Sequence, residues 1–111
     1  MEITSQRFKH CDLLNVEGKV DSYTAPDLTK AIEALNIESR FKIVLDLSKL
    51  EYMSSAGFRA LLIGQRNCKR FNRGEIVLAA VPKRIMDALE LTGFTPLFKM
   101  YADIASAVGH F

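Results

Sequence analysis

Two near-continuous apolar segments constrain the fold more than any other feature of this chain. They are "FKIVLDL" at residues 41–47 and "GEIVLAAV" at residues 74–81. Apolar runs of this kind, with no regular alternation of polar residues, are typical of central strands covered on both faces of a parallel sheet. Each run is followed by a segment with helical spacing, and alternating strands and helices build a parallel sheet through right-handed crossovers.

The N-terminal part of the chain predicts a different strand arrangement. Residues 2–8 and 11–20 have short β-type patterns separated by the polar step "KH", which favours an antiparallel hairpin. A first helix follows, with Thr24 as N-cap and Pro26 in its first turn. Its apolar face is expected from Leu28, Ile32 and Leu35.

The remaining elements complete a small α/β domain. We predict helices at about residues 55–71 and 83–91, the second ended by Gly93, then a short strand in "PLFKMY" and a last helix in "ADIASAVGHF". The chain is therefore expected to be a single domain over residues 1–111. Its mixed central sheet has an antiparallel N-terminal edge, mainly parallel remaining strands, and about four flanking helices.

Composition excludes several classes of protein. The 111 residues are 49% hydrophobic and 25% charged, a globular balance for one domain. A formal charge of +2 is too small to imply nucleic-acid binding by itself, and no segment approaches the ~20 apolar residues of a membrane span. Cys11 and Cys68 lack CxxC spacing, so we expect buried, reduced thiols and a cytoplasmic protein.

No pattern of catalytic or ligand-binding residues is found. The chain has no G-x-S-x-G nucleophile elbow, phosphate-binding P-loop or dinucleotide fingerprint. His10 and His110 lie near the chain ends and are predicted to be surface residues. No metal-ligand pattern is formed by Asp12, Asp21, Asp27 and Asp46. We therefore expect neither an enzyme nor a cofactor or metal site.

The most distinctive local feature is "LEYMSSAG" at residues 50–57, which we call the serine loop. A strand-to-helix loop of this kind lies where the functional crevice of an open α/β sheet forms. One serine suffices to start the helix, and Ser54 is the better placed for that role. Ser55 is then a candidate phosphorylation site, although both hydroxyls can be purely structural. Gly57 allows close approach of a partner or, alternatively, a helix–sheet contact.

The helix after the serine loop has a basic face. At ~100° per residue, Arg59, Arg66 and Arg70 point within about 20° of one direction. Ile63 lies beside them and is expected to be partly exposed, while the sheet-facing side comprises Phe58, Leu61, Leu62 and Cys68. This face is either simply solvated or a protein-binding surface. Nucleic-acid binding is the third interpretation of this face in order of preference, because no aromatic residues interleave with the cations.

Taken in order, several segments resemble one bacterial family. These are Gly18–Asp21, "IVLDLSKLEYMSSAGFRALL", "RGEIVLAAVPKRI" and "LELTGFTPLFKMYADIASAV". Together they are similar to the STAS domain of anti-sigma factor antagonists, also called anti-anti-sigma factors, from about Leu14 to Val108. The family loop often reads D-S-S-G or D-S-T-G, whereas this one reads S-S-A-G.

The resemblance implies a regulatory switch. Unphosphorylated members bind an anti-sigma factor that is also a GHKL-type serine kinase, and so release a sigma factor or another target. Phosphorylation of the loop serine switches binding off, and a metal-dependent serine phosphatase restores it. Alignment places that serine at Ser55, with Ser54 as the alternative acceptor. The expected partner-binding residues are Asp21, Tyr23, Ser54, Ser55, Gly57, Phe58, Arg59, Ile63 and Arg66.

Two alternatives remain open at the level of sequence. The chain can instead be a STAS subunit of a sensory or transport complex in which the serine loop is not phosphorylated. A small nucleotide-binding or hydrolysing protein is a third reading, and the missing phosphate loop argues against it. In the leading reading the protein is a monomer or weak dimer that contacts neither nucleic acid nor a membrane.

Overall fold

The computed structural model describes residues 1–111 and contains one six-stranded sheet. The strands are β1 (Glu2–Arg7), β2 (Asp12–Val20), β3 (Lys42–Asp46), β4 (Leu50–Met53), β5 (Glu75–Ala79) and β6 (Lys99–Tyr101). Their order is β1-β2-β3-β5-β6, and β4 pairs with the second half of β2. Only the β1–β2 pair is antiparallel, which confirms the predicted mixed sheet with an antiparallel N-terminal edge.

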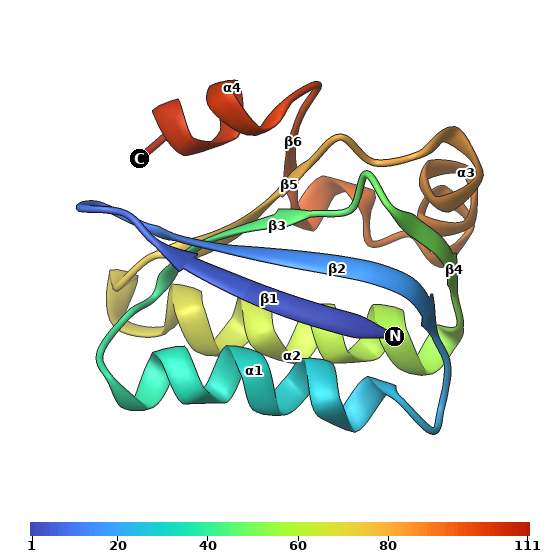
Figure 1. Ribbon diagram of the computed structural model, residues 1–111, viewed down its shortest axis with the longest axis horizontal. Coiled ribbons are helices and arrows are strands. Elements are labelled where there is room, and N and C mark those ends of the chain that lie inside the picture. The colour runs from blue at the N-terminus through green and yellow to red at the C-terminus, as the bar shows by residue number, and fades with distance from the viewer.

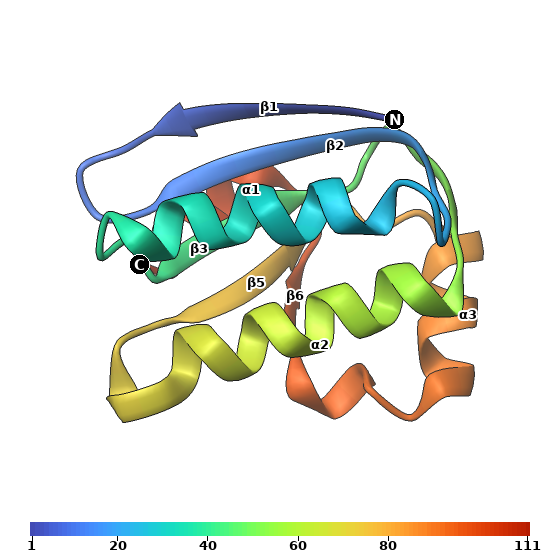
Figure 2. The same ribbon diagram turned by 90° about the horizontal axis from the view of Figure 1, so that it is seen from below.

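Helices cover both faces of this sheet (Figure 1). The α-helices are α1 (Ala25–Ile37), α2 (Ser55–Lys69), α3 (Lys83–Thr92) and α4 (Ile104–Gly109), and two short 3-10 helices are η1 (Arg70–Asn72) and η2 (Thr95–Leu97). Helices α1 and α2 lie side by side on one face, as Figure 2 shows from below, and α4 lies on the other. Helix α3 stands beside β4 at the end of the molecule where the parallel strands finish.

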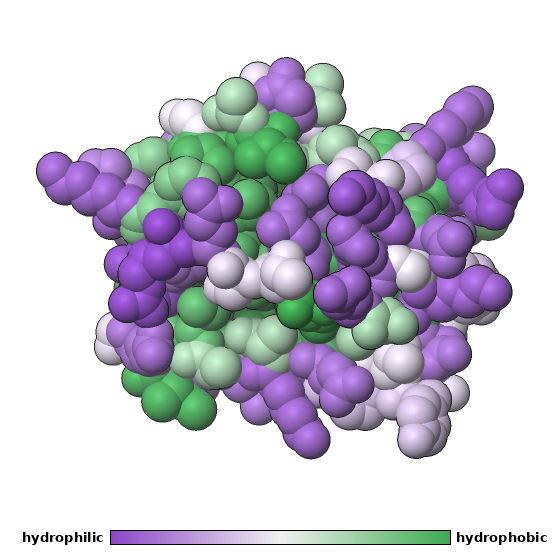
Figure 3. Space-filling view, in the orientation of Figure 1, coloured by the Kyte–Doolittle hydropathy of each residue, from purple (hydrophilic) through white to green (hydrophobic).

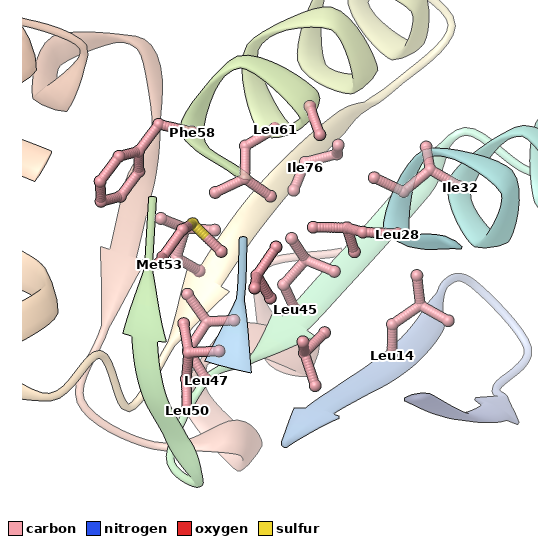
Figure 4. Close-up of a cluster of buried hydrophobic side chains, with 14 of the residues drawn as sticks. Leu14, Leu28, Ile32, Leu45, Leu47, Leu50, Met53, Phe58, Leu61 and Ile76 are labelled. Atoms are coloured by element: carbon pink, nitrogen blue, oxygen red, sulfur yellow. The ribbon is translucent and has the colours of Figure 1, made fainter. Parts of the chain in front are cut away.

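Two apolar clusters form the core, one on each face of the sheet. The larger one lies between the sheet and helices α1 and α2, where Leu28 and Ile32 of α1 meet Leu45 and Ile76 of the central strands (Figure 4). The smaller one, beneath α4, consists of Cys11, Leu13, Val44, Val77, Ala79 and Ala107. The two central strands therefore bury side chains on both faces, as their apolar runs predict.

Both cysteines are buried and unpaired, in agreement with the sequence analysis. Burial raises the pKa of the Cys11 thiol and of the Cys68 thiol. A raised pKa keeps a thiol protonated and poorly nucleophilic.

Several local predictions need correction. The predicted loop at residues 50–57 is half strand, because residues 50–53 form β4 along the bulged second half of β2. Helix α2 ends at Lys69 rather than near Phe71, whose backbone is left-handed. His110 is not a free surface residue, since its ring contacts Tyr101 Oη at 2.8 Å and Glu75 Oε2 at 3.2 Å. The end of α3 at a left-handed Gly93 is confirmed.

A buried glutamine that the sequence analysis missed joins α2 to the sheet. Gln65 Nε2 donates to the carbonyl oxygens of Ile76 (3.0 Å) and Leu97 (2.7 Å), and its Oε1 accepts from Ile76 N–H at 2.6 Å. Both N–H groups of the amide and its oxygen therefore have partners, and only one lone pair of the oxygen is unused. These bonds set the position of α2 relative to β5.

None of the helices has the length and apolar character that a membrane span requires. No group of three or more His, Cys, Asp or Glu side chains is arranged to hold a metal ion.

Candidate partner-binding site at the serine loop

The serine loop lies beside the turn that follows β2. Strands β2 and β4 run parallel with Val20 opposite Met53, so both end at the same edge of the sheet. Ser54 N–H donates to the carbonyl oxygen of Val20 at 2.8 Å, which joins the two segments directly. Strand register therefore places Asp21, the residue after Val20, next to the serine loop.

Ser54 starts helix α2 through its backbone alone. It occupies the N-cap position in an extended conformation, and its carbonyl oxygen accepts from Phe58 N–H at 3.1 Å. Its hydroxyl, however, makes no capping bond and is buried without a hydrogen-bond partner. The expected side-chain cap is thus absent, because the hydroxyl is turned into the protein.

Ser55 differs from its neighbour in exposure. It is the first residue of α2 and is exposed to solvent, so a modifying protein can reach it. Because Ser54 offers no capping oxygen, the first amides of the helix have no side-chain acceptor. Free amides and the positive end of the helix dipole both favour a negative group at this position.

Asp21 closes the neighbouring turn. Its Oδ1 accepts from Tyr23 N–H at 2.9 Å and from Thr24 N–H at 3.0 Å, while Thr24 Oγ1 accepts from Asp21 N–H at 2.9 Å. These bonds, with that from Thr24 foremost, lower the pKa of Asp21 below its ordinary value. The carboxylate therefore caps this turn, and Tyr23 beside it is exposed.

Gly57 and Phe58 do not present side chains to a partner. Phe58 is only 4% exposed and belongs to the large core cluster, because the helical period turns it toward the sheet. A Cβ on Gly57 would lie 2.5 Å from Met53 Cγ and 2.9 Å from Val20 Cγ1. The inclusion of Phe58 in the partner surface is thus corrected, and Gly57 is a helix–sheet contact that lets α2 approach the ends of β2 and β4.

The outer face of α2 continues from Ser55 along the helix. Arg59 and Arg66 are exposed and form no ion pair, and Ile63 between them is 42% exposed, as predicted. Helix α2 contains no acidic residue. The site thus combines an exposed hydroxyl, a structured carboxylate turn and a basic face with one apolar residue, a combination suited to recognition by another protein.

Comparison with known proteins gives matches over nearly the whole chain. The STAS domain family model matches residues 2–107. The anti-sigma-B factor antagonist of Listeria monocytogenes is 28% identical over 100 residues, which make up 90% of this chain and 86% of that protein. The anti-sigma-B factor antagonist of Staphylococcus aureus is 29% identical over 84 residues, or 76% of this chain and 77% of that protein.

Solved structures share the fold at lower identity. An anti-sigma factor antagonist from Mycobacterium paratuberculosis superimposes with a TM-score of 0.86 at 24% identity, covering 98% of this chain and 92% of that one. The phosphorylated form of the Bacillus cell fate determinant SpoIIAA gives a TM-score of 0.77 at 14% identity, covering 98% of both chains. A sulfate transporter family protein from Wolinella succinogenes gives 0.75 at 19% identity, covering 88% and 81%. The fold alone therefore does not assign a pathway.

Proposed function

Since this chain belongs to the STAS domain family, we propose that it is an anti-sigma factor antagonist, a regulatory binding protein that acts by partner switching. Its unphosphorylated form binds an anti-sigma factor and thereby releases a sigma factor or another target. The relatives with this name support the proposal, because they match this chain over most of their own length. The observation that carries it in the structure is the exposed Ser55 at the start of α2, beside the Asp21 turn.

Ser55, rather than Ser54, is the proposed phosphoacceptor. A kinase must bring the acceptor hydroxyl into its own active site, and the Ser54 hydroxyl is buried whereas Ser55 is exposed. A phosphate on Ser55 would meet the uncapped amides of α2, so the domain can accept the modification without unfolding. SpoIIAA, which has the same fold, has been described in a phosphorylated form.

The proposed switch acts at the interface. A phosphate adds a charge of about −1.5 to −2, which must be desolvated when a partner covers the serine loop. The Asp21 carboxylate in the neighbouring turn adds negative charge on the same side. Unless the partner supplies cations, the phosphate weakens binding, and each ~1.4 kcal/mol of binding free energy that is lost lowers the affinity tenfold.

The proposed partners are an anti-sigma factor that is also a GHKL-type serine kinase, and a metal-dependent serine phosphatase that reverses its action. Arg59, Ile63 and Arg66 are proposed to extend the contact along the outer face of α2. Asp21 and Tyr23 are proposed to contact the partner from the adjacent turn.

The test begins with affinity capture of the chain from its source cells, followed by mass spectrometry of the copurified proteins. A captured anti-sigma factor kinase is then incubated with the purified chain and ATP, and the phosphosite is mapped. We expect phosphate on Ser55, no phosphorylation of Ser55→Ala, and normal phosphorylation of the matched Ser54→Ala variant. Ser55→Asp is expected to bind the partner at least about tenfold more weakly, and Ser55→Ala to bind as the wild type does.

Two results would contradict the proposal. Capture of transporter or sensory-complex components in place of an anti-sigma factor would favour the STAS-subunit alternative. Phosphate found only on Ser54, or wild-type affinity in Ser55→Asp, would remove Ser55 as the switch.

A further inference from the structure

A second distinctive surface lies at the opposite end of the molecule from the serine loop. There the amino ends of the parallel strands meet the carboxyl ends of α1 and α2, on the left of Figure 1. We call it the amino-end surface and define it by Lys9, Ile37, Phe41, Lys42, Phe71 and Arg73. In Figure 3 the same end shows hydrophobic atoms near the end of α1, next to hydrophilic side chains.

Phe71 is the most unusual residue of this surface. Its backbone is left-handed, with φ 59° and ψ 25°, a conformation that costs a bulky residue free energy and that glycine or asparagine adopts more readily. Its side chain is nevertheless 78% exposed, so it adds little to the core. Neither local geometry nor core packing accounts for a phenylalanine here.

The side chain of Arg73, next to Phe71, is held by hydrogen bonds to the backbone. Its Nε donates to the carbonyl oxygen of Arg70 at 3.0 Å and its Nη2 to that of Asn67 at 2.6 Å, so it caps the end of α2. Its guanidinium carbon lies 3.9 Å from the ring centroid of Phe41 and 5.7 Å from that of Phe71. The arginine thus lies within cation–π range of two aromatic rings and is held in place by the backbone.

Phe41 and Arg73 also line two cavities. One, of about 220 Å³, is completed by Lys9, His10, Cys11, Ser39, Arg40 and Lys42, and no carboxylate lines it. Lys9 and Lys42 make no ion pair, so their charges are free. The other, of about 330 Å³, is completed by Glu33, Asn36, Ile37 and Asn67, and Ile37 is 85% exposed.

We propose that the amino-end surface docks an acidic segment of a second protein, one that contains a bulky apolar residue. Carboxylates of that segment pair with Lys9 and Lys42 at the first of these cavities, and the apolar side chain packs against Ile37 and Phe71. Exposed aromatic, arginine and aliphatic residues in one patch are typical of protein interfaces. The Glu33 carboxylate and the aliphatic Ile37 at the second cavity disfavour a nucleic-acid backbone there.

This docking is separate from the proposed switch. The surface is at the end of α2 remote from Ser55, so a partner can occupy it whatever the phosphorylation state of the loop. Failure of the docking experiment therefore leaves the proposed function untouched, and the reverse also holds.

The test uses a fluorescein-labelled peptide of sequence Glu-Asp-Glu-Leu-Phe-Glu-Asp-Glu and fluorescence anisotropy with the whole chain. We expect saturable binding that the double variant Phe71→Ser, Lys42→Glu weakens at least about tenfold. The matched control is the double variant Leu91→Ser, Arg84→Glu on α3. It makes the same change in charge and also replaces a highly exposed apolar residue, since Leu91 is 90% exposed. The control is expected to bind within about twofold of wild type.

Three outcomes would overturn the proposal. They are equal loss of binding in the control, equal binding of a peptide with Ser-Ser in place of Leu-Phe, and tighter binding of a single-stranded oligonucleotide than of the peptide. Phe71→Asn guards against a folding artefact, because asparagine tolerates the left-handed backbone. Its unfolding temperature is expected to be at least that of the wild type, and about 3 °C higher if the strain is fully relieved. It is still expected to lose peptide binding.

Discussion

Replacing Gly57 by alanine tests how closely α2 must approach the sheet behind the serine loop. The new Cβ would lie 2.5 Å from Met53 Cγ and 2.9 Å from Val20 Cγ1. Both distances are shorter than packed carbon atoms allow. Val20 is fully buried and β-branched, and Met53 Cγ is not the free end of its side chain, so neither atom can simply turn away.

Two opposing contributions determine the size of the effect. Alanine is favoured over glycine inside a helix by about 1 kcal/mol. Overpacking a well-filled core costs about 1–3 kcal/mol. We therefore expect Gly57→Ala to lower the free energy of unfolding by about 1 kcal/mol, with the N-terminal turn of α2 displaced from the ends of β2 and β4.

Gly64, on the same helix, provides the matched control. A Cβ there would lie 3.0 Å from Ile32 Cδ1 and 3.1 Å from Ile76 Cδ1, which are the free ends of flexible side chains. The helix preference for alanine should offset this milder crowding, so Gly64→Ala is expected within about 0.5 kcal/mol of wild type. Urea unfolding followed by circular dichroism measures both variants. If Gly57→Ala is as stable as Gly64→Ala, the close approach of α2 at Gly57 is not a constraint on the fold.

Three further predictions concern individual side chains. Since the native pKa of Asp21 is lowered, its ionised form stabilises the fold fully above the ordinary carboxyl pKa of about 4 and loses that effect as pH falls through the lower native value. The wild type should therefore be more stable than Asp21→Asn at neutral pH but not in strong acid, and a pH-independent difference in urea midpoint would refute this. Gln65→Met keeps the shape of the side chain but leaves the buried Ile76 N–H unpaired, so we expect the free energy of unfolding in urea to fall by about 1–3 kcal/mol. A variant as stable as the wild type would show that the hydrogen bonds of Gln65 are unimportant for stability. Cys11 and Cys68 should react with a thiol reagent at about pH 8 only after denaturation, and rapid native labelling would contradict their burial.

The candidate site was only partly predictable from the sequence. The order of strand, serine pair and basic helix placed Ser55, Arg59 and Ile63 on an exposed face, and the structure confirms their exposure. Helical periodicity likewise turns Phe58 inward, although the family resemblance suggested a surface role for it. Periodicity is thus the safer guide to exposure, because it follows directly from helix geometry.

Other features of the site depend on contacts between distant segments. The direction of the Ser54 hydroxyl and the bonds of Gln65 depend on which side chains and backbone groups surround them, and residues near in sequence do not determine this. Strand β4 was missed for the same reason. Four residues have little periodicity of their own, and β4 is recognisable only by its pairing with β2.

By itself, the sequence determined the class of fold. Continuous apolar runs specify buried parallel strands, helical spacing specifies the covering helices, and Gly93 specifies where α3 stops, since each depends on local geometry. Only the tertiary structure decided what lies together at each end of the sheet. It brought Asp21 beside Ser54 through strand register, and it gathered Lys9, Phe41 and Arg73 from three separate connections into one surface. Such neighbours are set by long-range packing, which no local pattern encodes.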